Sequence, residues 1–200
     1  MLPSGAIETS DNGGSGIAIA CDGGGNTLVD VGDVAASGNS GNGIEVESSS
    51  YDGHANVYLH GNTTSGNGSN GIQVAMSAST DATIEMRDNV SNENGADGLR
   101  ANVTTGNYLT LTGRSNVAKD NGGDGIDVTA LAGSGSYDFG TEADAGNNAL
   151  AGNTDFGMRW ADESGRDDQL SAQNNYWAGE PDYYGNILAD PYLTDDPSVP

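Results

Sequence analysis

The stretch Asn121-Gly122-Gly123-Asp124-Gly125-Ile126-Asp127-Val128 decides the fold, because its pattern recurs at nearly constant spacing along the 200-residue chain. The pattern is an Asn, three further residues, a Gly and a large aliphatic residue. It occurs at Asn12/Gly16/Ile17, Asn39/Gly43/Ile44, Asn67/Gly71/Ile72, Asn94/Gly98/Leu99, Asn121/Gly125/Ile126 and Asn153/Gly157/Met158. Successive glycines lie 27, 28, 27, 27 and 32 residues apart. A period of this length is typical of a stacked repeat protein.

Each repeat contains at least two short segments in which apolar and polar residues alternate. The first segment follows the repeat glycine, as in Ile126-Asp127-Val128. The second begins about ten residues after the first, as in Leu109-Thr110-Leu111 of the preceding repeat. Alternation with a period of two predicts β-strands. A unit of this size cannot bury its apolar face alone. We therefore expect the repeats to stack about 4.8 Å apart and to form parallel sheets.

The predicted fold class is therefore all-β, a single right-handed parallel β-helix (solenoid) of about six coils. We expect the β-helix to span residues 1–173 and a capping segment to span residues 174–200. The longer step between the last two repeat glycines predicts an outward loop near residues 140–144.

The repeat asparagines and glycines are expected at the corners of the coils. There Gly adopts positive φ freely and Asn does so more readily than most residues. Stacked asparagines can also hydrogen-bond to one another from coil to coil. A second column of this kind, nine residues before the next repeat glycine, consists of Asn62, Asn89, Asn116 and Asn148. The first two copies have Ile7 and Val34 at this position, so this ladder is expected to begin at the third coil.

The chain ends in a segment that is similar to the close of known β-helices. Asn174-Asn175-Tyr176-Trp177-Ala178-Gly179, followed by Ile187-Leu188-Ala189-Asp190-Pro191, resembles the "NNWWG…P" segment that often follows such repeats in the pectate-lyase-like superfamily. With the repeats, the resemblance covers nearly the whole chain. It implies the fold but leaves the function open, because that superfamily includes polysaccharide lyases, hydrolases, epimerases, phage fibres and structural surface proteins.

The composition limits the partners. The chain has 29 Asp and Glu residues against 6 Lys and Arg, a formal net charge of −23. Because this charge repels polyanions, we do not expect nucleic acid as a partner. No window approaches the ~20 apolar residues of a membrane span, so we do not expect membrane insertion. Cys21 is the only cysteine, which excludes an intrachain disulfide. An acidic, Lys-poor surface is typical of proteins from saline habitats and of extracellular adhesive proteins, so we expect an extracellular or cell-surface location.

One column concentrates positive charge. His60, Arg87 and Arg114 each lie eleven residues before a repeat glycine and should face outward on successive coils. Their expected neighbours are Tyr58, Glu85 and Asp88. One interpretation is a shallow groove in which arginine binds the carboxylates of an acidic polysaccharide. The other is a solvated ladder in which the acidic neighbours neutralise the arginines.

A second outward column follows the repeat glycines by two residues and alternates in charge. Its members are Glu45, Gln73, Arg100, Asp127 and Arg159. Opposite charges on stacked strands favour the correct register, so we interpret this column as structural.

Aromatic residues gather near the C-terminus. They are Phe156, Trp160, Tyr176, Trp177, Tyr183, Tyr184 and Tyr192. A solenoid must cover its last open coil, and large rings can do so. The alternative is a platform on which sugar rings stack, with Tyr183 and Tyr184 as the expected exposed pair.

No residue pattern typical of catalysis stands out. Carboxylates occur throughout the chain, so no acid–base pair can be singled out. Nucleophile triads, phosphate-binding loops and Cys/His metal patterns are not recognisable. No cofactor is identified, although calcium is a candidate where Asp190, Asp195 and Asp196 concentrate oxygen donors.

Two classes of function stay open. The first is a non-catalytic surface module that binds polysaccharide, serves as an adhesin stalk or associates with copies of itself. The second is a polysaccharide lyase or glycoside hydrolase, or a fragment of one, that acts on an acidic polysaccharide. A stack of about 29 Å is shorter than such lyases usually use, which favours the first class.

Overall fold

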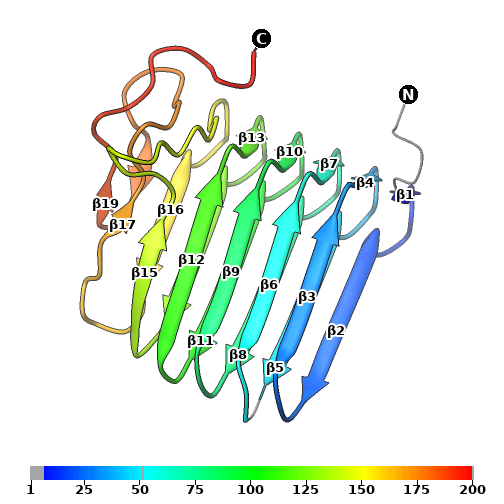
Figure 1. Ribbon diagram of the computed structural model, residues 1–200. Helices are drawn as coiled ribbons and strands as arrows, with labels where there is room; N and C mark the ends of the chain where they lie inside the picture. Colours follow the sequence, from blue (N-terminus) through cyan, green and yellow to red (C-terminus); the bar gives the residue numbers. More distant parts are fainter. Residues whose placement is uncertain (1–6, 51, 200) are drawn as a thin grey trace.

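The computed structural model describes residues 7–50 and 52–199. These residues form strands, turns and loops (Figure 1). This part of the chain contains no helix, and therefore none long and apolar enough to cross a membrane.

The strands form three parallel sheets. Sheet A consists of β1 (Ile7–Ser10), β4 (Val34–Ser37), β7 (Thr63–Ser65), β10 (Val90–Asn92) and β13 (Val117–Lys119). Sheet B consists of β2 (Ile17–Gly23), β5 (Ile44–Ser50), β8 (Ile72–Ala78), β11 (Leu99–Thr105), β14 (Ile126–Leu131), β16 (Met158–Asp162) and β18 (Tyr183–Tyr184). Sheet C consists of β3 (Thr27–Gly32), β6 (Ala55–His60), β9 (Ala82–Arg87), β12 (Tyr108–Arg114), β15 (Ser134–Asp138), β17 (Leu170–Ser171) and β19 (Ile187–Leu188).

The chain visits sheets A, B and C in turn, so each coil adds one strand or bridge to each side of a parallel β-solenoid. The predicted fold class is confirmed. Sheets B and C each have seven strands, one more than the number of sequence repeats. The additional coil comes from the closing segment, in which β18 pairs with β16 and β19 pairs with β17. Residues after 174 thus continue the stack as well as closing its end (Figure 1).

The core lies between the three sheets and repeats from coil to coil. In sheet B the register pairs Ile44 with Ile72, Ile72 with Leu99, and Leu99 with Ile126, and all four side chains are fully buried. Each such side chain contributes about 1.5–3 kcal/mol through removal of apolar surface from water. The alternation seen in the sequence therefore separates a continuous apolar interior from a polar surface.

Both predicted asparagine ladders are confirmed. In the first, each side-chain Nδ2 donates to Oδ1 of the next coil's asparagine at 2.9–3.1 Å, from Asn12 to Asn153. The second begins at Asn62 and has distances of 2.8–3.0 Å. It extends beyond Asn148 to Asn175 in the closing segment. In both ladders the same Oδ1 also accepts the backbone N–H of the preceding coil, so one buried amide satisfies the corner of its neighbour.

The predicted reason for Gly and Asn at the corners was wrong. Positive φ falls instead on the residue before each ladder position, with values from 51° to 70°. These residues are Asp11, Gly38, Gly66, Glu93, Asp120 and Gly152 for the first ladder, and Gly61, Asp88, Ser115, Asn147 and Asn174 for the second. Asp33, before Val34 in the same column, also has positive φ. The repeat glycine is required for a steric reason. A Cβ on Gly98 would lie 2.7 Å from the carbonyl oxygen of Gly125. Close stacking of the next coil therefore requires Gly.

The extra residues of the longest repeat form an outward loop, as predicted. The loop turns between Thr141 and Asp144, where the Thr141 N–H donates to the Asp144 carbonyl at 2.8 Å. Residues 142–144 are exposed, and the second ladder resumes at Asn148. The insertion thus leaves the register of the stack intact.

The ladder predicts a large effect of Asn94→Leu. Oδ1 of Asn94 accepts both the backbone N–H and the Nδ2 of Asn67, at 3.2 and 2.9 Å. Leucine would leave the buried N–H of Asn67 without an acceptor and would remove one of the two hydrogen bonds of its Nδ2, which keeps the Ala36 carbonyl. An unsatisfied buried donor costs about 1–3 kcal/mol. Urea unfolding should show this loss in the free energy of unfolding. Asn102→Leu, at an exposed position of β11, is the matched control and should change it by less than about 0.5 kcal/mol. Equal losses in the two variants would contradict the structural role of the ladder.

Candidate functional site

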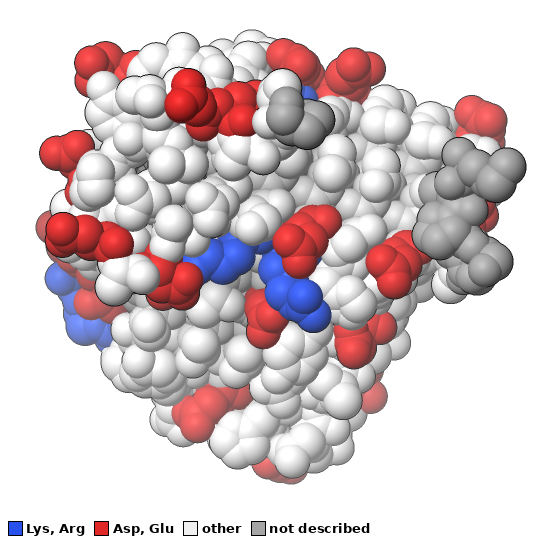
Figure 2. All heavy atoms as spheres, turned by 45° about the horizontal axis from the view of Figure 1, so that its top comes forward, with Lys and Arg blue, Asp and Glu red and all other residues white. Residues whose placement is uncertain are grey.

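The basic column forms at the C-terminal ends of three sheet C strands. The register pairs His60 of β6 with Arg87 of β9, and Arg87 with Arg114 of β12. The three side chains therefore stack on successive coils, as the spacing predicted. On the face shown in Figure 2, Lys and Arg atoms are few and lie beside Asp and Glu atoms.

Each member of the column has an acidic partner. His60 Nε2 lies 3.0 Å from Asp30, and Arg87 Nε lies 3.0 Å from Glu85. A second Arg87 nitrogen lies 3.5 Å from Asp88. These groups are solvent-exposed, so each pair contributes at most about 1 kcal/mol to stability. The pairs nevertheless place negative charge where a polyanion would have to approach.

Arg114 is held more tightly. Its Nη2 lies 2.8 Å from Asp138 and 3.0 Å from Asp144, and its Nη1 donates to the carbonyls of Gly113 and Asp138. These hydrogen bonds and negative charges raise the pKa of Arg114 despite its desolvation, which is the largest opposing effect. The guanidinium is thus occupied by the next coil and by the outward loop.

Every Lys and Arg in the chain lies within ion-pair distance of at least one carboxylate. The remaining pairs in the described residues are Arg100 with Asp97 and Asp127, Lys119 with Asp196, Arg159 with Asp127, and Arg166 with Asp168. Among the described residues, therefore, every Lys and Arg side chain has a carboxylate partner.

A small pocket of about 200 Å³ lies beside the column. Its lining residues are Asp30, Tyr58, Leu59, His60, Glu85 and Arg87. The structure thus brings together Tyr58, His60, Glu85 and Arg87, four of the predicted glycan-binding candidates. Asp88 and Arg114 lie outside this pocket, and Tyr183 and Tyr184 belong to the C-terminal end of the stack.

A third polar ladder was missed from the sequence. It occupies the residue before each repeat glycine and runs through Ser15, Asn42, Asn70, Asp97 and Asp124. In each step a side-chain oxygen accepts the backbone N–H of the next coil, ending with Asp124 and the N–H of Phe156 at 2.9 Å. The signal was a column of Ser, Asn and Asp directly before Gly, but its changing residue type concealed it.

At the acidic end of this ladder, burial and mutual repulsion disfavour the charged form of the carboxylates. Burial raises the pKa of Asp97, and burial with the negative charges of Asp97, Asp127 and Asp155 raises the pKa of Asp124 to about 6. Asp127 is held by Arg159 at 2.7 Å and by Arg100 at 3.6 Å. Paired carboxylates with separated pKa values suit acid–base catalysis. Here Asp97, Asp124 and Asp127 are only 7%, 6% and 4% exposed, so the arrangement is inaccessible to a polymer.

The C-terminal aromatic residues divide between core and surface. Trp160 and Trp177 are buried, and Trp160 packs against Tyr137 with ring centroids 4.4 Å apart. Tyr183 and Tyr184 of β18 are 40% and 54% exposed. The tryptophans therefore plug the end of the core, whereas the two tyrosines present their rings to solvent.

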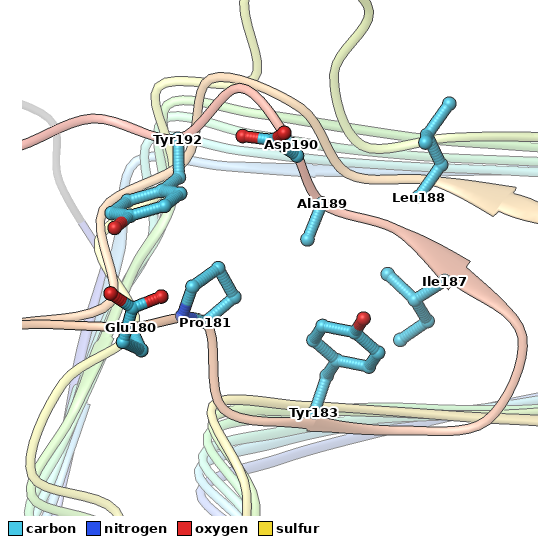
Figure 3. Close-up of a pocket in the computed structure, with 8 residues that line it drawn as sticks. All are labelled: Glu180, Pro181, Tyr183, Ile187, Leu188, Ala189, Asp190 and Tyr192. Atoms are coloured by element: carbon cyan, nitrogen blue, oxygen red, sulfur yellow. The ribbon is translucent and has the colours of Figure 1, made fainter.

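Each exposed tyrosine lines a different pocket. Tyr183 borders a pocket of about 420 Å³ with Glu180, Pro181, Ile187, Leu188, Ala189, Asp190 and Tyr192 (Figure 3). Tyr184 borders one of about 510 Å³ with Arg159, Trp160, Ala161, Asp162, Asp167, Gly185 and Asn186. The last coil thus combines apolar rings with carboxylates and amides over two neighbouring hollows, as is typical of small-ligand sites.

The described residues contain no group of three or more His, Cys, Asp or Glu side chains that could hold a metal ion. Of the proposed calcium donors, Asp196 binds Lys119 and the hydroxyl of Ser198.

Comparison with known proteins adds no assignment. No protein-family model, no curated protein and no solved structure matches this chain.

The third ladder predicts that Asp124→Asn stabilises the protein at neutral pH. With a folded pKa of about 6 against 3.8 for the ordinary group, the folded state binds more protons than the unfolded state between these values. Asp124 therefore disfavours folding increasingly as the pH rises from about 4 to about 6. Asn keeps the acceptor for Phe156 without the charge, so the free energy of unfolding should rise by about 1–3 kcal/mol at pH 7.

Urea unfolding at pH 7 and pH 4 measures this effect, which should shrink at pH 4. The reverse change in the same column, Asn70→Asp, should destabilise at pH 7. An unchanged or lower free energy of unfolding in Asp124→Asn would contradict the raised pKa of Asp124.

The net charge predicts that salt stabilises the fold. With a formal charge of −23 on a narrow stack, carboxylates repel one another, and added cations screen this repulsion. The melting temperature should rise between low and molar NaCl, and KCl should act alike because screening depends on ionic strength. An equal or lower melting temperature in molar salt would contradict this account.

Proposed function

We propose that the chain is a non-catalytic module of an extracellular or cell-surface protein, a right-handed β-helix of the pectate-lyase-like type, that binds glycan at its C-terminal end. The observation that carries this proposal is the pair of exposed rings, Tyr183 and Tyr184, each bordering its own pocket on the last coil. Tyrosine offers a flat apolar face to the C–H side of a sugar and a hydroxyl to its polar edge.

The pairing of cations with carboxylates supports this site over the basic column. A uronate polymer at Arg87 or Arg114 would have to displace Glu85, Asp88, Asp138 or Asp144, each already within 3.5 Å of a guanidinium nitrogen. The surrounding charge would also repel the polymer. A neutral or cationic glycan meets neither obstacle.

The alternative function is hydrolysis or lyase chemistry on a polysaccharide. The carboxylates with raised pKa, Asp97 and Asp124, are its best candidates for acid–base groups. Their burial against the N–H groups of the next coil supports a structural role instead.

Tyr183→Ala and Tyr184→Ala should each weaken glycan binding at least about tenfold, since stacking on an aromatic ring contributes about 1–3 kcal/mol in comparable sites. A glycan array on the wild type identifies the ligand, and calorimetric titration measures the variants. Tyr108→Ala, at an exposed tyrosine of β12, is the matched control and should bind like the wild type. The same glycans are assayed for new reducing or unsaturated ends. Equal binding by all three variants, or turnover of the glycan, would overturn the proposal.

A further inference from the structure

The pocket in Figure 3 lies between two segments of the last coil that face each other. Pro181 and the ring of Tyr183 lie on one segment, and Ile187 and Ala189 lie on the other. Tyr183, Ile187 and Ala189 give one end of the pocket an apolar wall, and Pro181 lies beside Glu180 (Figure 3).

The opposite end of the pocket is acidic. Glu180 and Asp190 lie there with Tyr192, whose ring is placed between the two segments (Figure 3). The negative charge of Glu180, desolvation and the negative charge of Asp190 raise the pKa of Tyr192. Both carboxylates therefore border the same pocket.

Among the residues that the structure describes, no cation neutralises this end. The pocket lining contains no Lys, Arg or His. The Lys and Arg residues of the C-terminal half are held elsewhere: Arg114 by Asp138 and Asp144, Lys119 by Asp196, Arg159 by Asp127 and Arg166 by Asp168. In this respect the pocket differs from the basic column, where each positive group already has its partner. The charge missing here is a positive one, and a ligand can supply it.

We infer that this pocket binds a glycan bearing a free, protonated amino group, with the sugar ring on Tyr183 and the ammonium between Glu180 and Asp190. The inference deepens the proposed glycan binding and rests on it. An ammonium–carboxylate hydrogen bond is charge-assisted and about twice as strong as a neutral one. Tyr183 and Tyr192 add the attraction of their ring faces for a nearby cation.

The size of the pocket favours a sugar over an extended lysine side chain. Its volume is about 420 Å³. Pockets that enclose a whole small molecule begin at about 300 Å³. A slender side chain would leave the apolar wall at Tyr183 and Ile187 uncovered. A pyranose ring can cover that wall while its amine reaches the carboxylates.

Calorimetric titration compares oligomers of glucosamine with N-acetylglucosamine oligomers of the same length, at a pH at which the free amine is charged. The wild type should bind the free-amine oligomer at least about tenfold more tightly, the difference that one charge-assisted bond supplies. Glu180→Gln combined with Asp190→Asn should remove this preference and leave affinity for the acetylated oligomer within about twofold.

A charge-matched variant separates the pocket from the general acidity of the protein. Asp22→Asn combined with Glu47→Gln removes two exposed carboxylates from sheet B and should keep the full preference. Melting temperatures of both double variants verify that they fold. Equal loss of preference in the two variants would assign it to net charge and overturn the inference.

The remaining outcomes are also decisive. If the wild type binds both oligomers equally, the amine inference is overturned while glycan binding stands. If it binds neither oligomer nor any glycan on the array, both proposals are overturned. A lysine oligomer that binds as tightly as the glucosamine oligomer would identify a general amine site and overturn the assignment to glycan.

Discussion

The hydrogen bond from one asparagine side chain to the next coil is the interaction on which the rest of this structure depends. A coil of about 27 residues has three corners, and at each corner backbone groups turn away from the sheets. The ladders from Asn12 and Asn62 supply buried acceptors to those groups at two of the corners. The third ladder, from Ser15, supplies acceptors at the same corner as the ladder from Asn12, beside the repeat glycine. Because an unsatisfied buried donor costs about 1–3 kcal/mol, this pairing fixes the register of the coils.

That constraint also explains where variation is tolerated. The loop at 141–145 enters between the end of β15 and Asn148, so the ladder resumes without a shift. The position before each ladder residue accepts Asp, Gly, Glu, Ser or Asn, because it needs only a left-handed φ. The repeat glycine does not vary, since atoms of the next coil occupy the space that a Cβ would need. These atoms are a carbonyl oxygen at Gly98 and the Ser91 side chain at Gly71.

Much of this was predictable from the sequence, and the remainder was concealed for physical reasons. The spacing of Gly98 and Gly125 predicted the stack and the column of Arg87 and Arg114. It could not identify Asp138 and Asp144 as partners of Arg114, because they lie on the next coil and on an insertion that breaks the period. The third ladder was missed because Ser, Asn and Asp all offer the same acceptor oxygen. The pocket at Tyr183 was beyond the repeat altogether, since the closing segment has none.

The same physics supports the proposal that a ligand binds at the end of the stack. In the interior of a solenoid each outward side chain has a neighbour one coil away, so charges there pair with one another, as Asp127 does with Arg159. Within the described residues, no strand follows β18 or β19 in their sheets. Its strands β18 and β19 are only two residues long, and the segments around them must fold over the core instead of stacking. Carboxylates such as Glu180 and Asp190 are thereby left facing a hollow, and a ligand can take the place of the missing coil.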